Sequence, residues 1–119
     1  SVCILPPLEL SRLAALYRRC ATFFHPLPAT GWGDPLRHAL ACGVPVVACA
    51  DALSAALAGP AAYLCPEGDA RRLGAGLLTQ IVETSMAEKL AEAAHKRAAA
   101  WKPSQFGSSL YTAYQQIIR

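Results

Sequence analysis

The sequence has 119 residues, enough for one domain built around one hydrophobic core. Hydrophobic residues make up 54% of it and charged residues only 16%, which excludes a disordered chain. The net charge of +3 comes from basic residues scattered along the chain, a distribution that argues against nucleic-acid binding.

Strand-like apolar runs alternate with helical patterns from the first residues onward. The run at residues 2–5 is predicted to be a strand that Pro6 and Pro7 end. Asp34 and Pro35 begin a helix, because aspartate caps helix N-termini and proline fits the first helical turn. In all, we predict strands at residues 2–5, 21–25, 44–49 and 61–65. We predict helices at residues 8–20, 34–42, 51–58, 69–83, 85–101 and 104–118.

This alternation predicts the α/β class. Parallel strands joined by right-handed helical crossovers give a Rossmann-like, doubly wound sheet of about four strands, here with a helical C-terminal tail. Ligands in such sheets bind where the carboxyl ends of the strands lead into loops. Of these loops, only residues 26–33 are rich in glycine and lead straight into a capped helix. Glycine lets a phosphate approach the backbone, and the N–H groups at a helix N-terminus attract anions, so we expect the ligand here.

The five cysteines include no Cys-x-x-Cys pair, and several lie in apolar runs, where a free thiol behaves as a small hydrophobic group. We expect reduced thiols in a cytoplasmic protein that binds no metal and no other cofactor. No apolar run reaches the roughly 18 residues that span a bilayer. Contact of the scattered basic residues with a membrane surface stays open as a weaker alternative.

The segment from His25 to Cys49 resembles the signature of the group 1 glycosyltransferases, family 4 in the classification of sugar-active enzymes. In words, that signature reads Pro-Ser, two residues, Glu-Gly-Phe-Gly, one residue, Pro, two residues, Glu-Ala, one residue, Ala-Cys-Gly, one residue, Pro-Val-Val-Ala. The chain matches it at Pro26, Gly31, Gly33, Pro35, Ala39, Ala41, Cys42, Gly43, Pro45, Val46, Val47 and Ala48. Residues 9–17, 59–67, 69–78 and 106–114 also resemble family segments, so the resemblance covers nearly the whole chain.

The resemblance implies the C-terminal half of a GT-B fold, the domain that binds the nucleotide-sugar donor of a retaining transferase. It implies that residues 1–119 form a single partial domain without the N-terminal acceptor domain. Gly31, Trp32 and Gly33 are expected to hold the donor pyrophosphate, with Thr30 near the sugar and His38 near the ribose. The substrate is then a nucleotide-diphosphate sugar whose hexosyl group moves to a glycan, a lipid or a small-molecule acceptor.

The chain departs from the signature at its two glutamates, which are replaced by Thr30 and His38, so no catalytic residue is assigned. A carboxylate accepts from two vicinal hydroxyls at once, whereas threonine and a neutral histidine each make a single bond. Asp34, the remaining donor-site candidate, reads more simply as an N-cap, and its charge would repel a pyrophosphate. We expect the isolated chain to be inactive and leave open whether its parent is an enzyme. The alternative is a non-catalytic, glycosyltransferase-like structural or regulatory partner domain.

Apolar residues recur at helical spacing along residues 106–118 and form one stripe. The resemblance implies that this final helix packs against the N-terminal domain. We therefore expect Tyr114, Ile117 and Ile118 to be exposed or to contact another copy of the chain. The alternative is that the tail folds onto the helix at 85–101 and buries the stripe.

Overall fold

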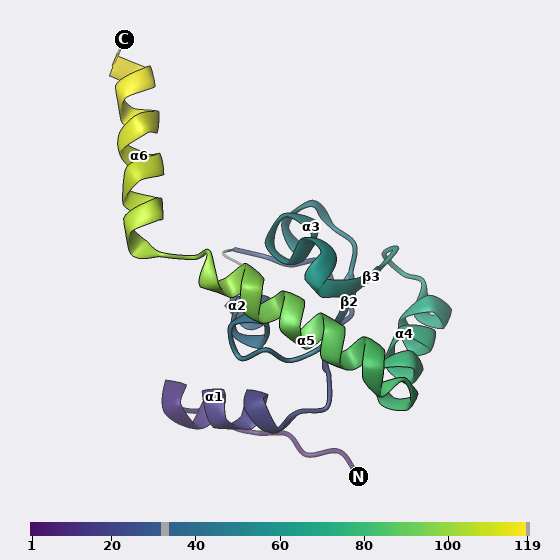
Figure 1. Ribbon diagram of the computed structural model, residues 1–119. Coiled ribbons are helices and arrows are strands. Elements are labelled where there is room, and N and C mark those ends of the chain that lie inside the picture. The colour runs from purple at the N-terminus through teal and green to yellow at the C-terminus, as the bar shows by residue number, and fades with distance from the viewer. Residues whose placement is uncertain (32–33, 119) are drawn as a thin grey trace.

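The computed structural model describes residues 1–31 and 34–118, with the backbone alone at residue 34. Within these residues, three parallel strands form one sheet in the order β1-β2-β3 (Figure 1). The strands are β1 (Phe23–His25), β2 (Val46–Cys49) and β3 (Ala62–Cys65). The helices are α1 (Leu10–Arg19), α2 (Asp34–Ala41), α3 (Ala52–Ala58), α4 (Ala70–Val82), α5 (Thr84–Ala99) and α6 (Pro103–Ile118), with a 3-10 turn η1 (Gly59–Ala61) after α3.

The central strand β2 is buried on both faces, which explains why its sequence is apolar throughout. Val46 and Ala48 belong to one buried cluster, together with apolar residues of α2, α3 and α5. Val47 belongs to a second buried cluster, with side chains of α4 and β3. Because successive strand residues point to opposite faces, helices cover both sides of the sheet. The predicted α/β class is confirmed.

The predicted strand at residues 2–5 does not form. Residues 1–9, all of them described, contain neither helix nor strand, and Val2 and Ile4 are 94% and 92% exposed. A strand is stable only when its backbone groups pair with a neighbouring strand, and residues 1–9 pair with none of the three described strands. The apolar run has the side chains typical of a strand but no neighbouring strand to pair with. The described sheet therefore has three strands instead of about four.

Helix α5 crosses the body and contacts the C-terminal ends of α3 and α2. Arg97 donates from Nε to the carbonyl of Leu57 at 2.8 Å and from Nη2 to that of Ala56 at 2.6 Å, which satisfies the end of α3. Gly43 ends α2 with φ +68°, and a Cβ there would overlap the ring of His95. The glycine after α2 therefore serves both the helix end and the close approach of α5.

Helix α6 leaves the body as a separate arm, seen at the upper left of Figure 1. None of its described residues is buried. Tyr114, Ile117 and Ile118 are 57%, 78% and 81% exposed, which confirms that this end of the stripe is uncovered within one chain. The alternative, in which the tail folds back and buries these side chains, is wrong. Contact with another copy stays a prediction.

Candidate functional site

The loop from β1 to α2 is held in place by the side chain of Asp51, which follows β2. One carboxylate oxygen of Asp51 accepts from the amide of Ala29 at 3.1 Å and from the hydroxyl of Ser54 at 2.6 Å. The other accepts from the amides of Leu53 and Ser54 at 3.0 and 3.1 Å, capping α3. One side chain thus ties together two loops at the carboxyl edge of the sheet.

These four hydrogen bonds fix the charge of Asp51. Burial on its own raises the pKa of the carboxyl, but the bonds from the Ser54 hydroxyl and from the amides of Ala29, Ser54 and Leu53 outweigh burial and lower the pKa to about 2. The sequence placed Asp51 at the start of a helix, in a loop that follows a strand, and assigned it no role at the ligand site. The signal that was available is its place directly after a buried strand, at the edge where ligands bind.

His25, at the end of β1, orders the first turn of the same loop. Its Nδ1 lies 2.7 Å from the carbonyl oxygen of Leu27. Because a carbonyl only accepts, Nδ1 carries the proton and donates. His25 therefore acts on the backbone of the loop. Pro28 and Ala29 are partly buried, and Thr30 is exposed to solvent.

Gly31 has the left-handed backbone that favours glycine, with φ +58°. A Cβ built on it would have no described atom within 4 Å, so the described residues leave room for a ligand at this position. The expected glycine-dependent conformation is present here, although the expected close contact is absent among the described atoms. Trp32, Gly33 and the side chain of Asp34 lie outside the described residues.

His38 lies one turn into α2 and faces α1 instead of the loop. Its ring meets that of Tyr17 edge-on, with centroids 6.2 Å apart, and the Tyr17 hydroxyl donates to the carbonyl of Pro35 at 3.3 Å. Burial, followed by the neighbouring Cys42 and Cys20, raises the pKa of Tyr17 and keeps it a donor. A hollow of about 300 Å³ between α1 and α2 is lined by Leu10, Leu13, Ala14, Tyr17, His38, Ala41 and Cys42.

The six predicted site residues therefore do not all gather at one point. Thr30 and Gly31 are exposed in the loop that precedes α2, whereas His38 lines an apolar groove beside that helix. Both places border α2: the loop precedes its first residue, and His38 lies one turn into the helix. The two features are an exposed backbone at Thr30 and Gly31, before the N-terminus of α2, and an apolar groove that contains the imidazole of His38.

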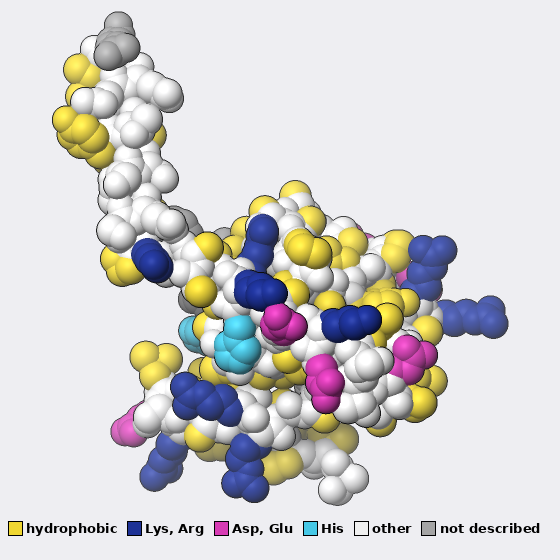
Figure 2. Space-filling view, in the orientation of Figure 1, with side chains coloured by type: hydrophobic (Ala, Val, Ile, Leu, Met, Phe, Trp, Pro, Cys, Tyr) yellow, Lys and Arg dark blue, Asp and Glu magenta, His cyan; other side chains and the backbone are white. Residues whose placement is uncertain are grey.

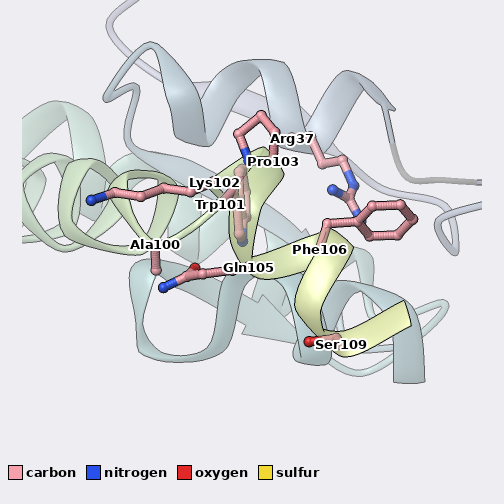
Figure 3. A pocket seen from close by; sticks show the side chains of 8 residues that line it. All are labelled: Arg37, Ala100, Trp101, Lys102, Pro103, Gln105, Phe106 and Ser109. Carbon is pink, nitrogen blue, oxygen red and sulfur yellow. The ribbon is translucent and has the colours of Figure 1, made fainter. Parts of the chain in front are cut away.

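A second hollow, of about 610 Å³, lies where α5 passes into α6 (Figure 3). It is lined by Arg37, Ala100, Trp101, Lys102, Pro103, Gln105, Phe106 and Ser109. The guanidinium carbon of Arg37 is 5.5 Å from the ring centroid of Trp101, a cation–π distance. Sequence reasoning missed this hollow, because its walls come from helices that are far apart in the sequence.

Among residues 1–31 and 34–118, no three side chains of His, Cys, Asp or Glu are arranged to hold a metal ion. None of the described helices has the length and apolar character needed to cross a bilayer.

A comparison with protein families identifies the family of this chain. The family model described as Glycosyl transferases group 1 matches residues 1–97, which include the Asp51-tethered loop, the α1–α2 groove and all three strands. No curated protein sequence matches the chain.

Proposed function

The chain belongs to the group 1 glycosyl transferases, and we propose that it is the donor-binding part of a retaining, family 4 enzyme with the GT-B fold. Its ligand is a nucleotide-diphosphate sugar, and the transferred group is a hexosyl unit. The acceptor is a glycan, a lipid or a small molecule held by a separate N-terminal domain. The enzyme works in the cytoplasm and without a metal ion.

The observation that carries the proposal is the Asp51-tethered loop. Asp51 orders the backbone at Ala29, so that Thr30 and Gly31 are presented in open space before the N-terminus of α2. A helix N-terminus with an exposed glycine suits a pyrophosphate, because its N–H groups have no partner within the helix. In the proposed complex Gly31, Trp32 and Gly33 contact the diphosphate and Thr30 reaches the sugar.

The α1–α2 groove supports the position of the nucleoside. Its walls are apolar apart from the Tyr17 hydroxyl and the ring of His38, a combination that suits a planar base with a ribose at its polar end. His38 then makes a single hydrogen bond to a ribose hydroxyl. Backbone N–H groups stabilise the charge that develops on the departing diphosphate, so the proposed chemistry needs no protein nucleophile.

A second candidate function rests on the two replaced glutamates. Thr30 and His38 each make one bond where a carboxylate makes two, which weakens donor binding. A chain that keeps the fold but binds the donor weakly would act as a non-catalytic partner of an active transferase. Donor affinity separates the two candidates.

The test is titration calorimetry of nucleotide-diphosphate sugars with the chain and with the double variant Thr30→Glu/His38→Glu. Each restored carboxylate adds a charge-assisted hydrogen bond, so we expect affinity to rise by about tenfold or more. Thr84→Glu, an exposed threonine at the start of α5, is the matched control and leaves affinity unchanged. No gain in the double variant contradicts a donor site at this loop.

A further inference from the structure

Cys49 and Cys65 are the last residues of two neighbouring parallel strands, β2 and β3. The strand pairing places them directly opposite each other, as partners in register. Successive strand residues point to opposite faces, so each cysteine shares a face with the residue two positions earlier, Val47 or Tyr63. Val47 and Tyr63 are also partners in register, and both pack in the cluster that contains Cys65. The two thiols therefore lie on the same side of the sheet.

The spacing of the two strands suits a disulfide bond. Hydrogen-bonded neighbouring strands lie about 4.7–4.9 Å apart, and the Cα atoms of disulfide-bonded cysteines lie about 4.4–6.8 Å apart. Burial raises the pKa of the Cys65 thiol most, followed by Asp69 and then by Cys49, while Arg72 lowers it, so the two thiols are close enough to interact. The cysteines at positions 3, 20 and 42 lie in none of the described strands. Cys49 and Cys65 are thus the pair that the fold brings together.

The pair lies one residue from solvent on both strands. Cys49 and Cys65 are 0% and 1% exposed, but the next residues, Ala50 and Pro66, are exposed. Strand β3 has four residues and forms one edge of the described sheet. The turn between β3 and α4 lies at the surface of the body, at its right side in Figures 1 and 2. Short edge segments open locally at a lower cost than the core, so opening at the end of β3 admits a small oxidant.

We propose that Cys49 and Cys65, free thiols in this structure, form a reversible disulfide that links β3 to β2, with a small-molecule disulfide such as glutathione disulfide as the oxidant. The Cys65 thiolate attacks one sulfur of the oxidant and displaces one molecule of glutathione. The Cys49 thiolate then attacks the Cys65 sulfur of this mixed disulfide and displaces the second. The protein loses two protons and two electrons, and the oxidant gains both as it becomes two thiols.

The surroundings of the pair favour the disulfide once it has formed. Burial, followed by Glu67 and Asp51, raises the pKa of Cys49. Both thiols are then protonated at neutral pH, so oxidation is slow and the reduced pair gains no stability from a thiolate charge. Cysteine pairs whose reduced form is stabilised are strong oxidants, and this pair is of the opposite kind. The disulfide therefore persists until a reductant is added, as in the redox-sensing disulfides of cytosolic proteins.

The disulfide locks the edge of the sheet beside the tethered loop. The amide of Ala50 donates to the carbonyl of Cys65 at 2.7 Å, directly next to the pair. Asp51, which holds the amide of Ala29, follows Ala50 in the chain. A cross-link between the strands suppresses the local opening that breaks the Ala50 hydrogen bond, so hydrogen exchange at this amide should slow at least about tenfold on oxidation.

The test is oxidation of the folded chain by glutathione disulfide in mildly alkaline buffer. Free thiols are then blocked, and the chain is digested with chymotrypsin, which cleaves after Tyr63 between the two cysteines, for mass spectrometry. We expect peptides joined through Cys49 and Cys65, with a mass lower by two hydrogen atoms, and recovery of both thiols with a reductant. The variants Cys49→Ala and Cys65→Ala lose this product. The matched control Cys3→Ser/Cys20→Ser removes two exposed thiols and keeps it.

Two results would overturn the proposal. Linked peptides that are absent from the oxidised folded chain, or that form only in urea, would show that the native sheet keeps the two thiols apart. Equal exchange at the amide of Ala50 in the oxidised and reduced chains would show that the bond does not hold β3. Both measurements use the unaltered chain, so they decide the question even where an alanine variant fails to fold. Neither uses a nucleotide sugar, so their outcome is independent of the proposed donor site.

Discussion

The packed body and the α6 arm contain the same kinds of apolar residue, yet the body buries them and the arm does not. Leu40 in α2 is fully buried, whereas Leu110 in α6 is 43% exposed. Both lie in amphipathic helices of similar sequence character, so the pattern alone does not decide burial. What decides it is whether the fold brings a second apolar surface to the helix: α2 packs on the sheet and on α5, whereas none of the described residues of α6 is buried.

We expect the largest difference in the free energy of unfolding between alanine variants of these two leucines. Leu40→Ala removes fully packed methyl groups and leaves a cavity, so we expect it to lower the free energy of unfolding by about 2–5 kcal/mol. Leu110→Ala opens no cavity and should change it by less than about 0.5 kcal/mol. Urea denaturation followed by circular dichroism measures both. Equal losses would mean that α6 packs on the body in solution.

We expect a smaller difference in stability between alanine variants of two helical glycines, one in α4 and one in α6. A Cβ at Gly76 would lie 2.7 Å from Cδ1 of Tyr63 and 3.1 Å from Cγ1 of Val47. Gly76→Ala should therefore force α4 away from the sheet and cost about 1–3 kcal/mol. Gly107 in α6 has open space, so Gly107→Ala should stabilise that helix by up to about 1 kcal/mol. Thermal denaturation measures the loss in Gly76→Ala, and circular dichroism measures the helix content of Gly107→Ala. A destabilised Gly107→Ala would contradict the exposed position of α6.

The next prediction concerns acid stability and the tethered loop. The pKa of Asp51 is lower in the folded chain, about 2, than its ordinary value of 3.8. Its contribution is therefore complete above about pH 4 and is lost as the pH falls toward 2. We expect this contribution to be about 1–2 kcal/mol, and Asp51→Ser to remove it from the acid limb of the stability profile.

Asp51→Ser also separates capping from tethering. Serine still caps α3, but it has no second oxygen to reach the amide of Ala29. Hydrogen exchange at Ala29 should then quicken while exchange within α3 changes little. Unchanged protection at Ala29 would show that the loop is ordered without Asp51.

The sequence predicted the helices and strands of the body better than it predicted the N-terminal residues and the contacts between distant segments. Alternating apolar runs and helical spacing, with the cap at Asp34, placed every described helix and the three described strands within a few residues. The strand expected at residues 2–5 failed because strand formation depends on a neighbour that a local pattern does not reveal. The tie from Asp51 to Ala29 and the hollow at Arg37 and Trp101 join distant segments, and spacing along the chain carries no signal for such contacts.

The candidate site was predicted as a motif, while its geometry was not. The glycine loop was identified from its glycines, its place before a capped helix and its match to the family signature, and Gly31 has the left-handed backbone that favours glycine. That His38 faces Tyr17 across an apolar groove follows from how α1 packs on α2, which the signature does not specify.

The most direct test of the donor site is a nuclear magnetic resonance titration of the chain with a nucleotide-diphosphate sugar. We expect the amide resonances of Thr30 and Gly31 and the ring resonances of His38 and Tyr17 to shift together with one saturation curve, while the resonances of α6 stay fixed. Shifts confined to other elements, or no shift at saturating donor, would contradict the assignment of the Asp51-tethered loop as the site that binds the nucleotide sugar.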